Sequence, residues 1–297
     1  RRGIRVRALR RWRSNTDALG GYADDIDWTV GDLQDQEALR WAVAGCDVVF
    51  HVAGLVPDWK TPRRTMMAQG LTAIRNTLAI LREVTLSRMV VVSSMVALTA
   101  DGQGGVKPRL PGTLGDDLVQ LRYFTELEVL KYAALGYPAV LVHPALCLGA
   151  GLRSQALVRA WTRGGVRPTC PGMALVIDGD DAARGIVESA ESGRVGERNL
   201  IPGHTVSLQK LADRLGTMAG RPGATLPMPR GAWRIWARRR LPRQVALLCQ
   251  HGCPLHGAGP RLTQMGSTGS NLITVGPSPK EIRSLDDTLH ACLGGVG

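Results

Sequence analysis

Met89-Val90-Val91-Val92-Ser93-Ser94 is the stretch that best indicates the fold. Four large apolar residues in a row, three of them β-branched, predict a strand that is buried on both faces. The two hydroxyl side chains that follow mark the point where this strand reaches a polar crevice. Because ligands of open α/β sheets bind at the carboxyl ends of the strands, we expect a ligand site here.

Strands and helices alternate on both sides of this stretch, and the hydrophobic period changes with them. Such an alternation is typical of right-handed βαβ units, and it predicts an α/β protein with a doubly wound parallel sheet. The expected strands are 4–9, 26–30, 47–52, 89–94 and 137–144, and the expected helices are 38–43, 66–81 and 117–134.

The second half of the chain is less regular. After Gly149-Ala150-Gly151 we expect helices near 155–161, 181–190 and 207–218, short strands near 175–177 and 199–201, and an amphipathic helix at 285–293. A chain of 297 residues with 44% hydrophobic content suits one large α/β domain or two unequal ones. We predict a domain over 1–150 and a smaller C-terminal α/β cap domain over 151–297, of which about 174–202 returns to the sheet.

The charge balance favours anionic partners but says nothing about the fold. There are 37 Lys+Arg against 25 Asp+Glu, a formal net charge of +12. Nucleic acid has only this charge to support it, so we expect no nucleic-acid partner. Segment 230–243 holds six arginines around Trp233 and Trp236. It is either an interfacial helix in peripheral contact with an anionic membrane or a solvated helix packed by its tryptophans.

The cysteines do not form the dense pattern of a disulfide framework. They stand at 46, 147, 170, 249, 253 and 292, which suits a reducing, cytoplasmic compartment. Cys249, His251, Cys253 and His256 fall within eight residues, but a structural zinc site pairs one close couple of ligands with a distant second couple. We therefore expect no metal.

The order of the short motifs along the chain resembles the extended short-chain dehydrogenase/reductase family. Its dihydroflavonol-reductase, 3β-hydroxysteroid-dehydrogenase and hopanoid-associated sugar-epimerase branches are the most similar. The motifs are Gly31-Asp32-Leu33, His51-Val52-Ala53-Gly54, Arg75-Asn76, Ser93-Ser94, His143-Pro144, and the segments 176–183, 196–200 and 284–289. The resemblance implies a Rossmann-like fold and an NAD(P)-dependent oxidoreductase or epimerase. It also implies a small sterol-, isoprenoid- or sugar-like alcohol or carbonyl as substrate, and a homodimer as one form of assembly.

The resemblance assigns cofactor-binding roles. Asp32 and Leu33 would hold the adenine, although Asp32 suits a helix-capping turn equally well. The small residues of His51-Val52-Ala53-Gly54 would let the backbone approach ribose and phosphates, although His51 alone is equally a partly buried packing residue. Arg10 and Arg11 stand where relatives that use NADP place an arginine on the 2′-phosphate, which favours NADP(H); solvated surface arginines are the alternative. His143-Pro144 and Arg122 complete the cofactor set.

The family's catalytic residues are only partly present. Ser94 resembles the serine that polarises the substrate oxygen. The tyrosine and the lysine four residues later, which transfer the proton and hold the ribose, are replaced by Leu118 and Arg122. Tyr123 is a weak substitute for the acid and is equally a packing residue. The matching position for a further relay asparagine is Gly70.

Three interpretations follow. The first is an enzyme of this family with an impaired catalytic motif. The second is a non-catalytic relative that keeps the fold as a binding or scaffold protein. The third is an ordinary enzyme whose sequence is incomplete here, because the first strand and the Gly-rich phosphate loop of the family are not found before the strand at 4–9.

Overall fold

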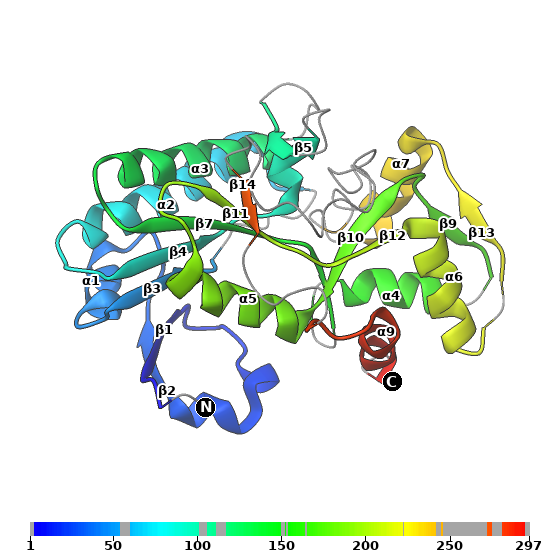
Figure 1. Cartoon of the computed structure of the whole chain (residues 1–297), viewed down its shortest axis with the longest axis horizontal. Coiled ribbons are helices and arrows are strands. Elements are labelled where there is room, and N and C mark those ends of the chain that lie inside the picture. Colours follow the sequence, from blue (N-terminus) through cyan, green and yellow to red (C-terminus); the bar gives the residue numbers. More distant parts are fainter. Residues whose placement is uncertain are drawn as a thin grey trace.

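The structure is a computed structural model that describes residues 3–53, 60–100, 106–110, 117–149, 152, 154–163, 165–221, 223–241, 245, 272–274 and 281–294. Its central layer is a five-stranded sheet in the order β14-β11-β7-β4-β3, in which all neighbours run parallel (Figure 1). These strands are β3 (Val48–His51), β4 (Arg88–Val92), β7 (Ala139–Pro144), β11 (Arg198–Ile201) and β14 (Leu272–Thr274).

Helices cover both faces of this sheet (Figure 1). One face carries α2 (Arg63–Leu81) and α3 (Asp117–Ala134), with α1 (Gln36–Val43) beside α2, and the other face carries α5 (Gly179–Ser192). Successive side chains of β4 enter opposite cores. Met89 and Val91 pack with α2 and α3, whereas Val90 packs on the α5 side. This two-sided burial explains the unbroken apolar run and confirms the predicted doubly wound α/β fold.

The two N-terminal strands form a separate sheet. β1 (Val6–Arg10) pairs in parallel with β2 (Ile26–Val30), and the 3₁₀ segment η1 (Asp17–Asp25) connects them. Among the described residues, no strand pairs with the second edge of β1 or of β3. Phe50 of β3 is 39% exposed and Val6 of β1 is 50% exposed. The expectation that 47–52 is a buried strand is wrong for Phe50, whose side chain is not fully covered by the elements packed on its face of the sheet.

The second half of the chain builds a smaller layer around its own core. Strands β12 (His204–Ser207), β10 (Met173–Asp178) and β8 (Leu146–Leu148) form a three-stranded sheet, and β13 (Thr225–Pro227) pairs with β9 (Arg167–Thr169). Trp161 and Trp233 are fully buried there. The remaining elements are η2 (Met95–Ala97), β5 (Leu98–Ala100), β6 (Val106–Pro108), α4 (Gln155–Thr162), α6 (Leu208–Met218), α7 (Arg230–Arg240) and α9 (Leu285–Gly294).

The two halves share the central sheet. β11 and β14, which come from the second half, extend that sheet beyond β7. A domain boundary at residue 150 remains a prediction. Within the described ranges, no helix is both long and apolar enough to cross a membrane.

Candidate functional site

A cavity of about 1980 Å³ lies beside β1 and along the β3 edge of the central sheet. Its walls come from β1, β3, the carboxyl end of β4, and the facing sides of α2, α3 and α5. Its lining includes residues along β1 and β3 and residues at the carboxyl ends of the strands, and the part at the strand ends is called the crevice below. The crevice lies where ligands of open α/β sheets bind.

Arg10 and Arg11 line this crevice at the end of β1. The guanidinium carbon of Arg10 lies 5.4 Å from the ring centroid of Trp28, in a cation–π contact. Arg10 Nε is buried and has no hydrogen-bond partner among the described residues. Arg11 is exposed. A buried donor without a partner is costly, so Arg10 is suited to receive an anionic oxygen.

Asp32 and Leu33 line the same crevice after β2. The Asp32 carboxylate accepts a hydrogen bond from the Gln34 backbone N–H at 3.0 Å, which forms a local turn. The cap of α1 is a different residue, Asp35, which accepts from the N–H groups of Glu37 and Ala38. The alternative in which Asp32 caps the following helix is therefore wrong.

His51, Val52 and Ala53 line the crevice at the end of β3, and Gly54 lies outside the described residues. Burial and the nearby charge of Arg122 lower the pKa of His51 to about 4, against a smaller opposing contribution from its hydrogen bond with the Ala53 backbone. His51 is therefore neutral at physiological pH. It adds a hydrogen-bonding ring to the crevice without adding charge.

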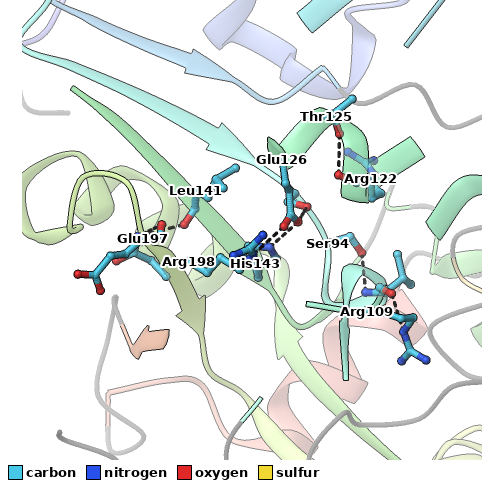
Figure 2. Close-up of polar contacts among 12 residues, drawn as sticks. Ser94, Arg109, Arg122, Thr125, Glu126, Leu141, His143, Glu197 and Arg198 are labelled. Carbon is cyan, nitrogen blue, oxygen red and sulfur yellow. Dashed lines mark hydrogen bonds and ion pairs between the residues drawn. The ribbon is translucent and has the colours of Figure 1, made fainter. Parts of the chain in front are cut away.

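Arg122 and Thr125 line the crevice from α3 (Figure 2). The Thr125 hydroxyl donates to the Arg122 backbone carbonyl at 2.9 Å. The Arg122 guanidinium has no hydrogen-bond partner within the described part of the chain, and burial lowers its pKa although the Glu126 carboxylate opposes this. Its donors therefore remain available on the cavity wall.

Glu126, one turn after Arg122, joins four elements (Figure 2). Its carboxylate accepts from Ser93 Oγ at 2.5 Å, from His143 Nε2 at 2.7 Å and from Arg198 Nε at 2.8 Å. Burial alone would raise the pKa of Glu126, but the charges and hydrogen bonds of these neighbours outweigh burial and lower it. Glu126 is therefore a buried anion held between α3, β4, β7 and β11.

The two catalytic candidates lie away from the described cavity wall. Ser94 is 2% exposed, and its hydroxyl accepts from the Val96 N–H at 3.4 Å, where it caps η2. Tyr123 packs edge-to-face on Phe124, with ring centroids 5.6 Å apart. His143 and Pro144 also stand back from the described wall, with His143 bound to Glu126.

Packing explains why the family's tyrosine and asparagine positions hold other residues. Leu118 is fully buried in an apolar cluster with Met66 and Val96. Gly70 of α2 lies against α3 so closely that an added Cβ would come within 2.7 Å of Leu121 Cδ1. An asparagine at position 70 would require the Leu121 side chain to move.

Ser93 was expected at the crevice but was given no role, and Thr125, Glu126 and Arg198 were not predicted at the site. Ser93, Thr125 and Glu126 line the cavity, and Arg198 supports it from β11. The spacing of four between Arg122 and Glu126 on one helix face was a usable signal. No sequence pattern indicates Arg198, since its partner lies 72 residues earlier.

No metal-binding group of three or more His, Cys, Asp or Glu residues occurs in the described ranges. Cys249, His251, Cys253 and His256 lie outside these ranges, so the expectation of no metal there remains a prediction.

Several known proteins are similar to this chain in sequence or in fold. Residues 1–136 match a family model described as NAD(P)H-binding. A putative dihydroflavonol 4-reductase from Synechocystis sp. is 29% identical over 247 residues, which are 79% of this chain and 69% of the relative. Sterol demethylase protein B from Methylococcus capsulatus is 26% identical over 277 residues, 88% of this chain and 83% of the relative.

Among solved structures, a nucleoside-diphosphate-sugar epimerase from Pseudomonas aeruginosa superimposes with a TM-score of 0.70 at 21% identity, over 99% of this chain and 89% of that one. A dTDP-glucose 4,6-dehydratase from Bacillus anthracis, solved in complex with NAD, gives 0.59 at 13% identity, over 84% and 86%. At these identities the likeness supports the fold. Residues 1–136 therefore match an NAD(P)H-binding family model, and the whole chain is similar to reductases and epimerases that share this Rossmann-type fold.

Proposed function

We propose that this protein is an NAD(P)-dependent oxidoreductase or epimerase that acts on an alcohol or carbonyl of a sterol-, isoprenoid- or sugar-like substrate, with NADP(H) as the preferred cofactor. The observation that carries the proposal is Arg10, whose buried Nε has no partner among the described residues, at the edge of the strand-end crevice. A 2′-phosphate would satisfy this donor with a charge-assisted hydrogen bond. The hydroxyl of an NAD ribose would satisfy it less well.

The rest of the crevice fits a dinucleotide. Asp32 and Leu33 line the same cavity as Arg10 and would hold the adenine, and the small side chain of Ala53 would let the linking phosphates approach the backbone. Arg122 offers donors to ribose hydroxyl oxygens at the far side. A bound NAD(P) supplies the hydride acceptor or donor, and the chain's own residues bind and orient it.

The proposal includes two candidate residues for orienting the substrate oxygen and transferring its proton. Ser94 is kept as the candidate that orients the substrate oxygen, and Tyr123 as the weak candidate for the acid. Both lie away from the described cavity wall, so each role requires a shift of the strand end or of α3 when substrate binds.

A non-catalytic binding protein is the second candidate, and Leu118 favours it. A fully buried leucine at the tyrosine position cannot transfer a proton, and Arg122 cannot reproduce the lysine's effect on a missing phenol. This protein would bind the dinucleotide as a structural or sensing ligand.

Turnover after cofactor binding separates the two candidates. NADPH and NADH are titrated by nicotinamide fluorescence, and the loaded protein is then assayed with hydroxysteroids, dihydroflavonols and nucleotide sugars. Binding followed by turnover supports the enzyme. Binding without turnover on any of them supports the second candidate, and the absence of binding contradicts both.

The exposed face of α7 supports a peripheral contact with an anionic membrane. Trp233 and Ala237 are buried, whereas Arg234, Ile235 and Arg238 face solvent, and Ile235 is 65% exposed. Exposed arginines around an apolar side chain suit an interfacial helix. In sedimentation with phosphatidylserine vesicles at low salt, R234A/R238A should lose binding and R63A/R75A should keep it. No binding by the unmodified chain at low salt would contradict this contact.

A further inference from the structure

The Ser93 hydroxyl donates a hydrogen bond to the Glu126 carboxylate. The Ser93 Oγ to Glu126 Oε1 distance is 2.5 Å, and both side chains are nearly fully buried. Because Glu126 is held as an anion by Arg198 and His143, its carboxylate can only accept. Ser93 must therefore be the donor in this contact. Its remaining hydrogen-bonding capacity is that of an acceptor.

The position of Ser93 brings this acceptor to the cavity. The Ser93 backbone N–H donates to Val142 O at 2.8 Å, which continues the pairing of β4 with β7 and fixes the residue at the strand end. Ser93 and Glu126 both line the cavity, next to Arg122 and Thr125 of α3. Arg10 lines the same cavity from the end of β1, which belongs to a different sheet from β4. Under the proposed function, the adenosine half lies toward Arg10 and the nicotinamide half toward Ser93.

Polarity then assigns partners on the nicotinamide half. The Arg122 guanidinium only donates, so it suits the oxygen atoms of the ribose hydroxyls. Ser93 accepts toward the cavity, so it suits an N–H donor, and the carboxamide is the N–H-bearing group of that half. We propose that Ser93 binds the carboxamide N–H of the nicotinamide, and that Glu126 is a positioning residue which sets the acceptor polarity of Ser93. This inference rests on the proposed function, since it needs a dinucleotide in the crevice.

A matched pair of dinucleotides tests the hydrogen bond directly. NADP⁺ carries the carboxamide, whereas its 3-acetylpyridine analogue replaces the NH₂ group by a methyl group and cannot donate. Dissociation constants are measured by calorimetry on the full chain at pH 7, without substrate. We expect the unmodified protein to prefer NADP⁺ by about 3- to 10-fold, the value of one net hydrogen bond.

Variants at the two residues separate binding from positioning. S93A should bring the affinity ratio close to one, and S93T, which keeps the hydroxyl, should retain the preference. E126Q should lower the ratio, because a neutral amide no longer forces Ser93 to donate. E126D should retain part of the preference, and E128Q, on the exposed face of the same helix, should keep all of it. Melting temperatures of each variant show that the compared proteins are folded.

The outcomes are distinct. A preference for NADP⁺ that persists in S93A, or its absence in the unmodified protein, overturns the role of Ser93. A ratio that falls in S93A but not in E126Q overturns the role of Glu126. If neither dinucleotide binds to the unmodified protein, the proposed function fails together with this inference. If both bind equally, the inference alone fails.

Discussion

His143 Nε2 lies 2.7 Å from Glu126 Oε1, and this contact joins a fully buried side chain of β7 to α3. The same carboxylate also neutralises Arg198. Removing one partner of a buried ionic group leaves the others uncompensated. We expect E126A to lower the free energy of unfolding by about 3 to 5 kcal/mol in urea denaturation.

Glu128, two residues further on α3, provides the control. It pairs with Arg75 at 2.7 Å, but Arg75 is 60% exposed. Exposed pairs contribute little, so E128A should change the stability by less than about 1 kcal/mol. Equal effects of E126A and E128A would contradict a structural role for the buried cluster.

The stability should fall in mildly acidic solution because of His51. Its folded pKa of about 4 lies below its ordinary value of 6.5. Between these values the unfolded chain binds more protons than the folded chain, so the stability decreases as pH falls from 6.5 toward 4. The loss is at most about 3 kcal/mol, since part of the ring faces the cavity.

A variant without a titrating ring isolates this effect. H51N should show a flatter dependence of the unfolding free energy on pH between 6.5 and 4.5. Glu126 acts in the same direction only below its ordinary pKa, because its folded pKa is lowered and its contribution is lost as pH falls through that value. If H51N and the unmodified chain give the same slope, His51 does not titrate as described.

Restoring the tyrosine and lysine of the family motif should not restore catalytic turnover. L118Y/R122K recreates the tyrosine and lysine, but position 118 lies inside a packed cluster with Met66 and Val96. The larger ring would overpack this cluster at a cost of about 1 to 3 kcal/mol. We expect lower stability and no gain in turnover with the substrates above. A gain in turnover would show that the phenol can reach the cavity.

Much of the fold could be predicted because it depends on local patterns. The apolar run before Ser93 indicated a strand buried on both faces, and Met89 and Val90 do pack into opposite cores. The exposure of Phe50 could not be predicted in the same way. It depends on which elements pack on its face of the sheet, and the alternation of side chains along one strand does not show this.

The site residues at the ends of strands could be predicted from the sequence. The residues whose partners lie far away in the sequence could not. Arg10 and His51 are the last residues of strands and Asp32 follows one, and all three line one cavity. Glu126 is one of many polar residues on α3, and its partners come from three strands. The hydroxyl that lines the cavity is that of Ser93, because Ser94 turns to cap η2. Which of the two serines lines the cavity therefore depends on the turn after β4, and the Ser-Ser sequence alone does not show it.

The most direct measurement of the central claim is the affinity for NADPH and NADH of the unmodified chain, R10A and R13A, by nicotinamide fluorescence. Arg10 lines the crevice, whereas Arg13 is exposed outside it. We predict that the unmodified chain prefers NADPH and that R10A weakens NADPH binding by about 10- to 100-fold. R10A should leave NADH binding nearly unchanged, and R13A should leave both unchanged. Failure of the unmodified chain to bind either nucleotide, or equal weakening of both by R10A, would contradict this account.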